Sequence, residues 1–278
     1  MHCKVPKLTE RIFPARAERW RRVASLEAAE RAFHGPVSAS CYRIPAGVPA
    51  ASGRRIAFFS DLHWMDTEAV RRVVKAASGI IRDFKPHYLL CGGDVSSVAS
   101  EMKTLPDALA QFPDVPVKLA VPGNWERSKL WLELDFWREL FAAGGFRLLV
   151  NEFFIDDALA IYGLDDSKGG FPTFAGDWPA ERFRLMLAHN PDSAVAADGF
   201  GTVSGSQLVL CGHTHGGQIR LPWLGPLLTS SHYGCHFDAG LLANSQTGAQ
   251  MLITSGLGQY SFPWRFRCPR EVMLITLF

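Results

Sequence analysis

IAFFSDLH (residues 56–63) joins a buried strand to two side chains that can bind a metal ion. The four apolar residues at its start predict a strand that is covered on both faces. Asp61 and His63 follow where that strand ends. An Asp in this position is more often a turn former or a helix cap, so the stretch by itself leaves packing and ligand binding as alternatives.

The same arrangement recurs four times farther along the chain. Apolar runs end in Asp, Asn or His at HYLLCGGD (87–94), VKLAVPGN (117–124), RLMLAHN (184–190) and LVLCGHTH (208–215). The donors that they add are Asp94, Asn124, His189, His213 and His215. The carboxyl ends of strands in α/β folds converge on ligand crevices, so we expect these side chains and those of the first stretch to meet.

Seven oxygen and imidazole donors are too many for one tetrahedral zinc ion, which takes four ligands. If one carboxylate bridges, they suit two ions about 3.5–4 Å apart, as in two-metal phosphoryl chemistry. A mixed set of nitrogen and oxygen donors without thiolate favours Mn, Fe or Zn over Ca or Mg, and we expect two divalent ions with Mn preferred.

Helical and strand patterns alternate in the first half of the chain, and short strands dominate the second half. Apolar residues at helical spacing predict one helix from a cap at Asp66 or Thr67 to Phe84 and another over 127–143. This mixture predicts two sheets packed together and flanked by helices, a layered α/β sandwich. A chain of 278 residues is long enough for a large core.

The N-terminal part is basic. Residues 1–55 carry eleven Lys and Arg against four Asp and Glu, a balance of +7, whereas the remainder has a balance of −5. Residues 17–34 predict a helix that ends at Gly35-Pro36, either docked on the core or touching anionic lipid head groups. We therefore divide the chain into a basic N-terminal helix and linker (1–54) and a main domain (55–278).

Six scattered cysteines without a CxxC pair favour a reducing compartment. Neither a signal peptide nor a transmembrane helix is predicted. We expect a cytoplasmic protein, with a peripheral position on the inner face of the membrane as the alternative. The sequence makes no prediction of its oligomeric state.

The ordered motifs Asp61-Leu-His63, Gly92-Gly93-Asp94, Gly123-Asn124, His189 and Gly212-His213-Thr214-His215 resemble those of the calcineurin-like metallophosphoesterases. The resemblance begins near residue 55 and extends to the C-terminus. HNPD (189–192) and GHTHGGQIRLP (212–222) are similar to a bacterial subgroup of membrane-associated phosphodiesterases that includes a UDP-2,3-diacylglucosamine hydrolase.

The resemblance implies a four-layer α/β/β/α sandwich of two mixed sheets. It implies that Asp61, His63 and His215 hold one ion, that Asn124, His189 and His213 hold the other, and that Asp94 bridges them. It also implies hydrolysis by in-line attack of a metal-bridging hydroxide on phosphorus.

One position departs from the family pattern. Trp125 stands where most members have a His that is thought to protonate the leaving group, and an indole cannot titrate. The enzyme then either cleaves a pyrophosphate bond, whose leaving group needs no proton, or uses another acid among Glu126, His232 and His236. A third alternative is a non-catalytic module that binds phosphate compounds. We expect the catalytic side chains among Asp94, Asn124, Trp125 and Glu126.

Two apolar stretches bear on the substrate. RLPWLGPLL (220–228) and YSFPWRF (260–266) are either ordinary packed loops or an apolar rim that accepts acyl chains beside the metals. We expect a phosphorylated small molecule or lipid as substrate and rank nucleic acid lower, because no basic and aromatic platform accompanies the motifs.

Overall fold

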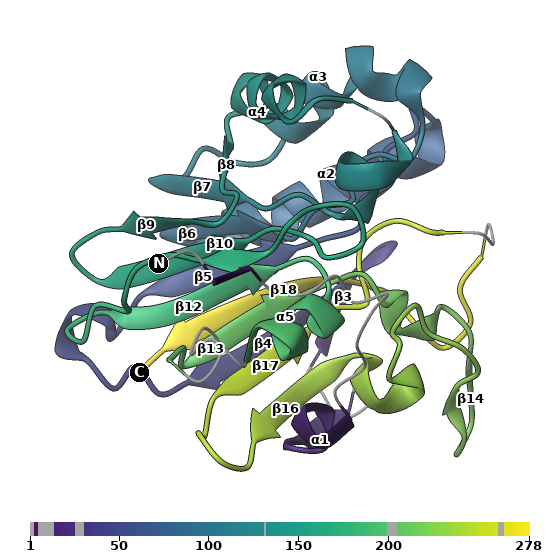
Figure 1. Ribbon diagram of the computed structural model, residues 1–278. Coiled ribbons are helices and arrows are strands. Elements are labelled where there is room, and N and C mark those ends of the chain that lie inside the picture. Colours follow the sequence, from purple (N-terminus) through teal and green to yellow (C-terminus); the bar gives the residue numbers. More distant parts are fainter. Residues whose placement is uncertain (1–2, 5–13, 26–30, 131, 199–204, 261–263) are drawn as a thin grey trace.

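Two seven-stranded β-sheets stacked face to face form the centre of the molecule (Figure 1). The computed structural model describes residues 3–4, 14–25, 31–130, 132–198, 205–260 and 264–278. The first sheet has the order β3 (Arg31–His34), β4 (Val37–Ile44), β18 (Arg270–Leu277), β5 (Arg55–Phe59), β6 (Tyr88–Cys91), β7 (Val117–Ala120) and β8 (Arg147–Leu148). The second has the order β2 (Trp20–Ser25), β16 (Gly240–Asn244), β17 (Gln250–Ile253), β13 (Leu208–Cys211), β12 (Phe183–Ala188), β10 (Leu159–Leu164) and β9 (Glu152–Ile155).

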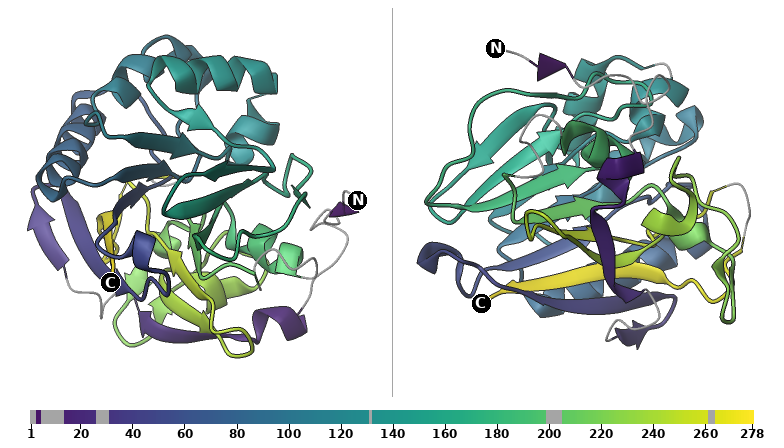
Figure 2. Two further views of the ribbon diagram at one scale, coloured as in Figure 1. Left: turned by 90° about the vertical axis from the view of Figure 1, so that its left-hand side faces the viewer. Right: turned by 60° about the horizontal axis from the view of Figure 1, so that its bottom comes forward.

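Helices cover the outer face of each sheet (Figures 1 and 2). The first sheet is covered by α2 (Glu68–Phe84), α3 (Leu105–Ala110) and α4 (Leu134–Ala143), and the second by α1 (Pro14–Ala17) and α5 (Pro191–Ala197). Shorter elements are the strand pairs β1 (Cys3–Lys4) with β11 (Thr173–Phe174) and β14 (Arg220–Leu221) with β15 (Gly225–Pro226), the 3₁₀ turns η3 (Pro49–Ala51), η4 (Ala99–Lys103), η7 (His215–Gly217) and η8 (Gly234–Phe237), and the π-helical turn η5 (Trp125–Lys129). The predicted four-layer α/β/β/α sandwich is confirmed.

Each central strand is buried on both faces. Phe58 of β5 belongs to the core between the sheets, together with Leu185 and Leu210 of the second sheet. Its neighbour Phe59 points to the opposite face and packs in the layer that contains Ile81 of α2. Successive side chains alternate between faces, so a strand that is buried twice reads as an unbroken apolar run.

Strand direction brings the polar strand ends together. The strands β5, β6, β7 and β8 are parallel, and so are β10, β12, β13 and β17. All the carboxyl ends of a parallel set lie at one edge of its sheet. The two edges meet where the predicted ligands lie.

The helix predicted over 17–34 is wrong. Its described residues form β2 at the edge of the second sheet and β3 at the edge of the first, and only the four residues of α1 precede them as a helix. Trp20 is fully buried, while Arg22 hydrogen-bonds to Asp238 and to the carbonyl of His236. Pairing with β16 outweighs a helix propensity worth only tenths of a kcal/mol per residue, about 0.7 at most. The described residues of 17–34 therefore form no membrane-facing helix, and residues 26–30 lie outside the described part of the chain.

The two other predicted helices fare differently. The helix ending at Phe84 is confirmed as α2, and the Thr67 hydroxyl accepts a hydrogen bond from the Val70 N–H at 3.3 Å. The helix predicted over 127–143 is divided into η5 and α4. The predicted helix is interrupted because residues of η5 form hydrogen bonds with the end of the preceding strand, as described below.

Candidate metal centre

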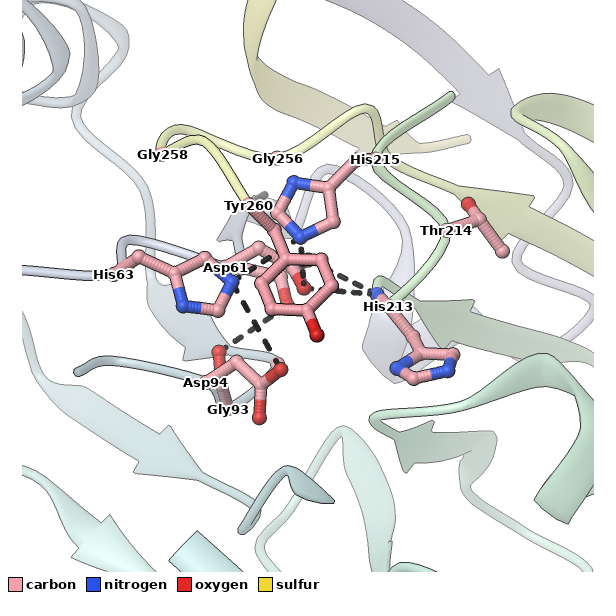
Figure 3. A network of polar contacts seen from close by, with 12 residues as sticks. Asp61, His63, Gly93, Asp94, His213, Thr214, His215, Gly256, Gly258 and Tyr260 are labelled. Carbon is pink, nitrogen blue, oxygen red and sulfur yellow. Dashed lines mark hydrogen bonds and ion pairs between the residues drawn. The ribbon is translucent and has the colours of Figure 1, made fainter. Parts of the chain in front are cut away.

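The seven predicted donors come together in the interior, at the junction of the two sheet edges. Figure 3 shows five of them, Asp61, His63, Asp94, His213 and His215. Each is at most 7% exposed. The ligand atoms of Asp61, His63 and His215 lie within 4.8 Å of one another, as do those of Asp94, His189 and His213. The six members of these two groups follow four different strands, β5, β6, β12 and β13, and all six are among the donors predicted from the sequence.

The separations between donors suit shared coordination of metal ions. His63 Nε2 lies 3.1 Å from His215 Nε2, which is itself 3.5 Å from Asp61 Oδ1. His189 Nε2 lies 3.0 Å from His213 Nδ1 and 3.2 Å from Asn124 Oδ1. Two ligands about 2.1 Å from one ion are about 3.0 Å apart at a right angle and about 3.4 Å apart at a tetrahedral angle. The two groups therefore fit one divalent ion each.

Asp94 lies between the two groups. Its Oδ1 accepts the backbone N–H of Trp125 at 2.9 Å. Its Oδ2 is 3.3 Å from His189 Nε2 and 3.9 Å from His63 Nε2. One oxygen is thus fixed by the backbone and the other faces donors of both groups, as a bridging carboxylate requires.

Strained backbone holds these side chains in place. Asp61, His63, Asp94, His213 and His215 all have a positive φ, between 44° and 70°. This region is costly for residues other than glycine, of order 1–3 kcal/mol each, and such strain clusters at functional sites. Five of the seven predicted donors thus have a costly backbone conformation, which indicates that the surrounding structure maintains this arrangement of side chains.

Two glycines permit the loops to approach so closely. A Cβ at position 123 would lie 2.1 Å from Asp94 Oδ1, and one at position 212 would lie 2.3 Å from Asp61 Oδ2. Any other residue at Gly123 or Gly212 would push a carboxylate out of the centre.

Burial leaves three of the histidines neutral. It lowers the pKa of His63 to about 4, and burial together with neighbouring cationic groups lowers the pKa of His213 and His215 well below the usual value. Neutral imidazole is the form that binds metal. These three ligands are therefore ready at neutral pH.

His189 is the exception. Burial lowers its pKa, but the charge and hydrogen bond of Asp94 outweigh burial and raise it to about 10. For Asp94, likewise, burial raises the pKa, but the charge and hydrogen bond of His189, the charge of His63 and the Trp125 N–H together outweigh burial and lower the pKa. His189 Nδ1 lies 2.7 Å from the carbonyl of Gly92, which fixes Nδ1 as the protonated nitrogen and turns Nε2 toward the donors. Without metal, His189 is the cation that neutralises Asp94.

The buried side chain of Glu126 holds two loops of the centre together. Its side chain is 1% exposed and accepts the backbone N–H groups of Asp94 (2.9 Å), Val95 (2.8 Å) and Gly123 (2.7 Å). These bonds join the strand end after β6 to the strand end after β7. They occupy both carboxylate oxygens, so the geometry favours a positioning role over donation of a proton to a leaving group. The π-helical turn η5 places the Glu126 side chain next to the loops that follow β6 and β7.

Three further side chains bear on the search for an acid or a substrate-binding group. Both candidate histidines lie on the segment after β15. His236 Nε2 lies 3.0 Å from the Ala17 carbonyl of α1, and the His232 backbone N–H donates to Asp192 of α5, so neither of these contacts involves a metal ligand. Lys168 was missed, yet its Nζ lies 2.7 Å from His213 Nε2 and 3.2 Å from the Ser230 carbonyl.

A signal for Lys168 was present. DDSK (165–168) follows the apolar strand LAIYGL directly, so it is a sixth polar strand end. Asp166 in the same run is fully buried, and burial raises its pKa to about 6.

Aromatic rings close one side of the centre. Tyr260 stacks on His63 and His215 with ring centroids 6.0 and 6.3 Å apart (Figure 3), and Trp125 meets both His63 and Tyr260 edge to face at 6.1 and 5.9 Å. Two hydrogen bonds between Gln218 and the Tyr260 backbone, 2.6 and 2.7 Å long, hold this segment in place. The sequence marked Tyr260 only as part of the apolar stretch YSFPWRF (260–266) and did not predict its stacking on the histidines, because these contacts depend on the path of the loop after β17.

Comparison with known proteins agrees with this geometry. A family model described as calcineurin-like phosphoesterase matches residues 54–217, more than half of the chain. The chain belongs to the calcineurin-like phosphoesterases. The family resemblance is thereby confirmed, whereas the diacylglucosamine hydrolase subgroup stays a prediction.

Two relatives of this phosphoesterase are similar over most of their length. The uncharacterized metallophosphoesterase YkuE of Bacillus subtilis is 29% identical, over 81% of this chain and 79% of its own. The phosphodiesterase YaeI of Escherichia coli is 28% identical, over 80% of this chain and 82% of its own. Among solved structures, a dimetal phosphatase from Danio rerio is 11% identical over 74% of this chain and 88% of its own, with a TM-score of 0.42.

Membership makes the chain a metal-dependent hydrolase of phosphoesters, with the two ligand groups as its candidate binuclear site. None of the described helices has both the length and the apolar composition that crossing a bilayer requires.

Proposed function

We propose that this phosphoesterase hydrolyses a phosphodiester or pyrophosphate bond whose leaving group departs without a proton, in a lipid-linked substrate such as UDP-2,3-diacylglucosamine. The observation that carries the proposal is Trp125 at the rim of the metal centre, in edge-to-face contact with His63 and Tyr260. Its indole can donate one hydrogen bond but cannot transfer a proton.

The ligand set defines what the centre does. When bound, two divalent ions would lower the pKa of water and neutralise charge on the phosphoryl oxygens. Asp61, His63 and His215 would hold one, Asn124, His189 and His213 the other, and Asp94 both. Mn²⁺ is the ion we propose, because the donors are carboxylate, amide and imidazole without thiolate.

The remaining side chains act on the substrate. Two cations lie against predicted ligands and could attract a phosphate oxygen: Lys168, 2.7 Å from His213 Nε2, and Arg265, 3.4 Å from His215 Nδ1. Tyr260 and Trp125 supply hydrogen-bond donors and aromatic faces, but neither replaces the histidine acid of the family. Loss of general acid catalysis costs about 10²–10⁴-fold for a poor leaving group and little for a nucleoside monophosphate.

A nucleotide phosphodiesterase is the second candidate. The exposed face of Tyr260 beside Trp125 could stack on a nucleobase, an interaction that tolerates any base. A uridine diphosphate substrate would use the same stacking, so the two candidates differ in their need for acyl chains.

A hydrolysis panel with Mn²⁺ tests the proposal. It compares UDP-2,3-diacylglucosamine, UDP-glucose, bis-p-nitrophenyl phosphate and glycerophosphoethanolamine, whose leaving group is an alkoxide. We expect the first to be hydrolysed fastest and the last slowest. Equal rates for both UDP compounds would refute the lipid substrate and favour the nucleotide alternative. Rapid cleavage of glycerophosphoethanolamine would refute the leaving-group argument, and hydrolysis of no compound would favour a binding module.

A further inference from the structure

We propose that one surface beside the metal centre docks onto an anionic phospholipid bilayer. The surface consists of the apolar hairpin (residues 220–228, containing β14 and β15) and the aromatic loop (residues 264–267). This proposal goes beyond the hydrolytic reaction, because docking requires neither bound metal nor a substrate.

Exposed apolar side chains are concentrated in these two segments. Among the described residues, fourteen large apolar side chains are exposed, and seven of them lie in these thirteen residues. The apolar hairpin contributes Leu221, Trp223, Leu224, Leu227 and Leu228, and the aromatic loop contributes Trp264 and Phe266. Scattered exposed apolar side chains are normal, but a contiguous group marks an interaction site.

The two segments form one surface. The backbone N–H of Arg220 donates to the Phe266 carbonyl at 3.0 Å, and the Phe266 N–H donates to the Gln218 carbonyl at 2.9 Å. In Figure 1 the strand β14 lies at the lower right, where it extends beyond the ends of the large sheets. The apolar side chains are therefore carried on a projecting edge that a flat surface can reach.

The backbone at the tip of the apolar hairpin is strained, and its tryptophan side chain is fully exposed. Trp223 has a φ of 62° and is 104% exposed, next to Leu224 at 69%. A left-handed backbone conformation is an outlier for a bulky residue. Exposure of the indole ring to water does not offset the energetic cost of this conformation. Trp is the side chain that is enriched at the head-group level of membranes, where its ring meets the acyl chains and its N–H stays hydrated.

The charge around this surface suits an anionic bilayer. Residues 199–270 contain four arginines and a single carboxylate, Asp238. Arg220 is buried, Arg265 and Arg270 are half-buried, and Arg267 is exposed. Asp238 is buried and bonded to Arg22 and Arg220, so it adds no exposed negative charge. Arg267 is exposed in the aromatic loop, next to Phe266. Apolar insertion together with basic residues is the pair of signals that peripheral membrane binding needs.

The docking surface is continuous with the metal centre. Leu228 of the apolar hairpin and Tyr260 line the same cavity as His215, with a volume of about 170 Å³. A bilayer that contacts the hairpin would therefore bring lipid head groups to the mouth of the centre.

Vesicle sedimentation with the full chain tests the proposal in EDTA, so that catalysis plays no part. Vesicles of phosphatidylcholine with about one quarter phosphatidylglycerol are compared with pure phosphatidylcholine. The double variant Trp223→Asn, Leu224→Ser should lose at least about tenfold in binding, since it removes two adjacent and strongly exposed apolar side chains at the tip of the hairpin. Asn tolerates a positive φ, so this variant is expected to fold, which circular dichroism verifies. Arg267→Gln should lose about fivefold on the anionic vesicles alone.

The matched control is Phe136→Ser with Ile155→Ser, which removes exposed apolar side chains from α4 and β9, far from the hairpin. It should bind like the wild type. Three results would overturn the proposal: a wild type that binds no vesicles at low salt, equal binding by the Trp223 and Leu224 variant, or equal loss in the control. If the wild type forms a dimer and binds no vesicles, and the hairpin variant is monomeric, the surface would instead be an interface with a second copy of the chain. A loss in hydrolysis without loss of vesicle binding would concern the proposed reaction only.

Discussion

Removal of the Glu126 carboxylate should loosen the metal centre without touching a ligand. The side chain is buried and accepts three backbone N–H groups, at 2.7, 2.8 and 2.9 Å. Burial raises the pKa of Glu126 to about 7, so the side chain is charged above that pH. A hydrogen bond to a charged group contributes about 1.5–3 kcal/mol, and a buried donor left without a partner costs a similar amount. Glu126→Ala should therefore lower the free energy of unfolding by about 4–5 kcal/mol, a large part of the 5–15 kcal/mol typical of a folded protein.

Glu126→Gln separates the contributions. An amide oxygen in place of Oε2 keeps the bonds from Asp94 and Gly123, while the NH₂ group faces the Val95 N–H and loses that bond. We expect a loss of about 2 kcal/mol. Glu101→Gln is the control, because Glu101 also accepts a backbone N–H, from Asp66 at 3.0 Å, but at the surface. It should change stability by less than about 0.5 kcal/mol.

Urea unfolding in EDTA, followed by circular dichroism, measures these differences in the metal-free protein. Calorimetric titration with Mn²⁺ then reports affinity, which should fall in the order wild type, Glu126→Gln, Glu126→Ala. The reasoning is refuted if Glu126→Ala unfolds at the wild-type urea concentration, or if Gln costs as much as Ala.

Three further predictions concern the centre itself. Asp94→Asn should reduce the Mn²⁺ stoichiometry below two per chain and lower hydrolysis of bis-p-nitrophenyl phosphate at least about a hundredfold; two bound ions with full activity would contradict the bridging role. Because the pKa of His189 is raised to about 10, this residue keeps its proton below that pH in the metal-free protein, and metal must displace it. Mn²⁺ affinity should thus rise about tenfold per pH unit between pH 7 and 9, with one proton released per chain in calorimetry across buffers, whereas a pH-independent affinity would exclude a protonated His189. Trp125→His should speed cleavage of alkyl diesters by about 10²–10⁴-fold and leave pyrophosphate cleavage nearly unchanged, as measured by kcat/KM; equal effects on both would argue against a missing acid.

Some of the fold could be predicted because the signal was local. The helix α2 was anticipated from apolar residues at helical spacing and a threonine cap, both of which lie within twenty residues of chain. Strands such as β5 and β13 were anticipated because burial on both faces leaves an uninterrupted apolar run.

The N-terminal strand could not be predicted in that way. WRRVAS in β2 contains arginines that favour a helix, and its partner β16 is more than two hundred residues away. A local pattern carries no record of such a partner, so the tertiary pairing decided the structure.

For the metal centre, the sequence by itself determined the inventory: seven donors, each placed where a strand ends, in an order that a known family shares. The donor types restrict the chemistry, because carboxylate, amide and imidazole can be read directly from the chain. Only the tertiary structure showed how close the donors lie to one another, which oxygen of Asp94 faces both groups, and that Glu126 accepts backbone N–H groups from two strand ends. It also brought Lys168 and Tyr260 to the centre and left Trp223 exposed beside it. Contacts between distant segments depend on strand order and backbone strain, and these emerge only when the sheets pack.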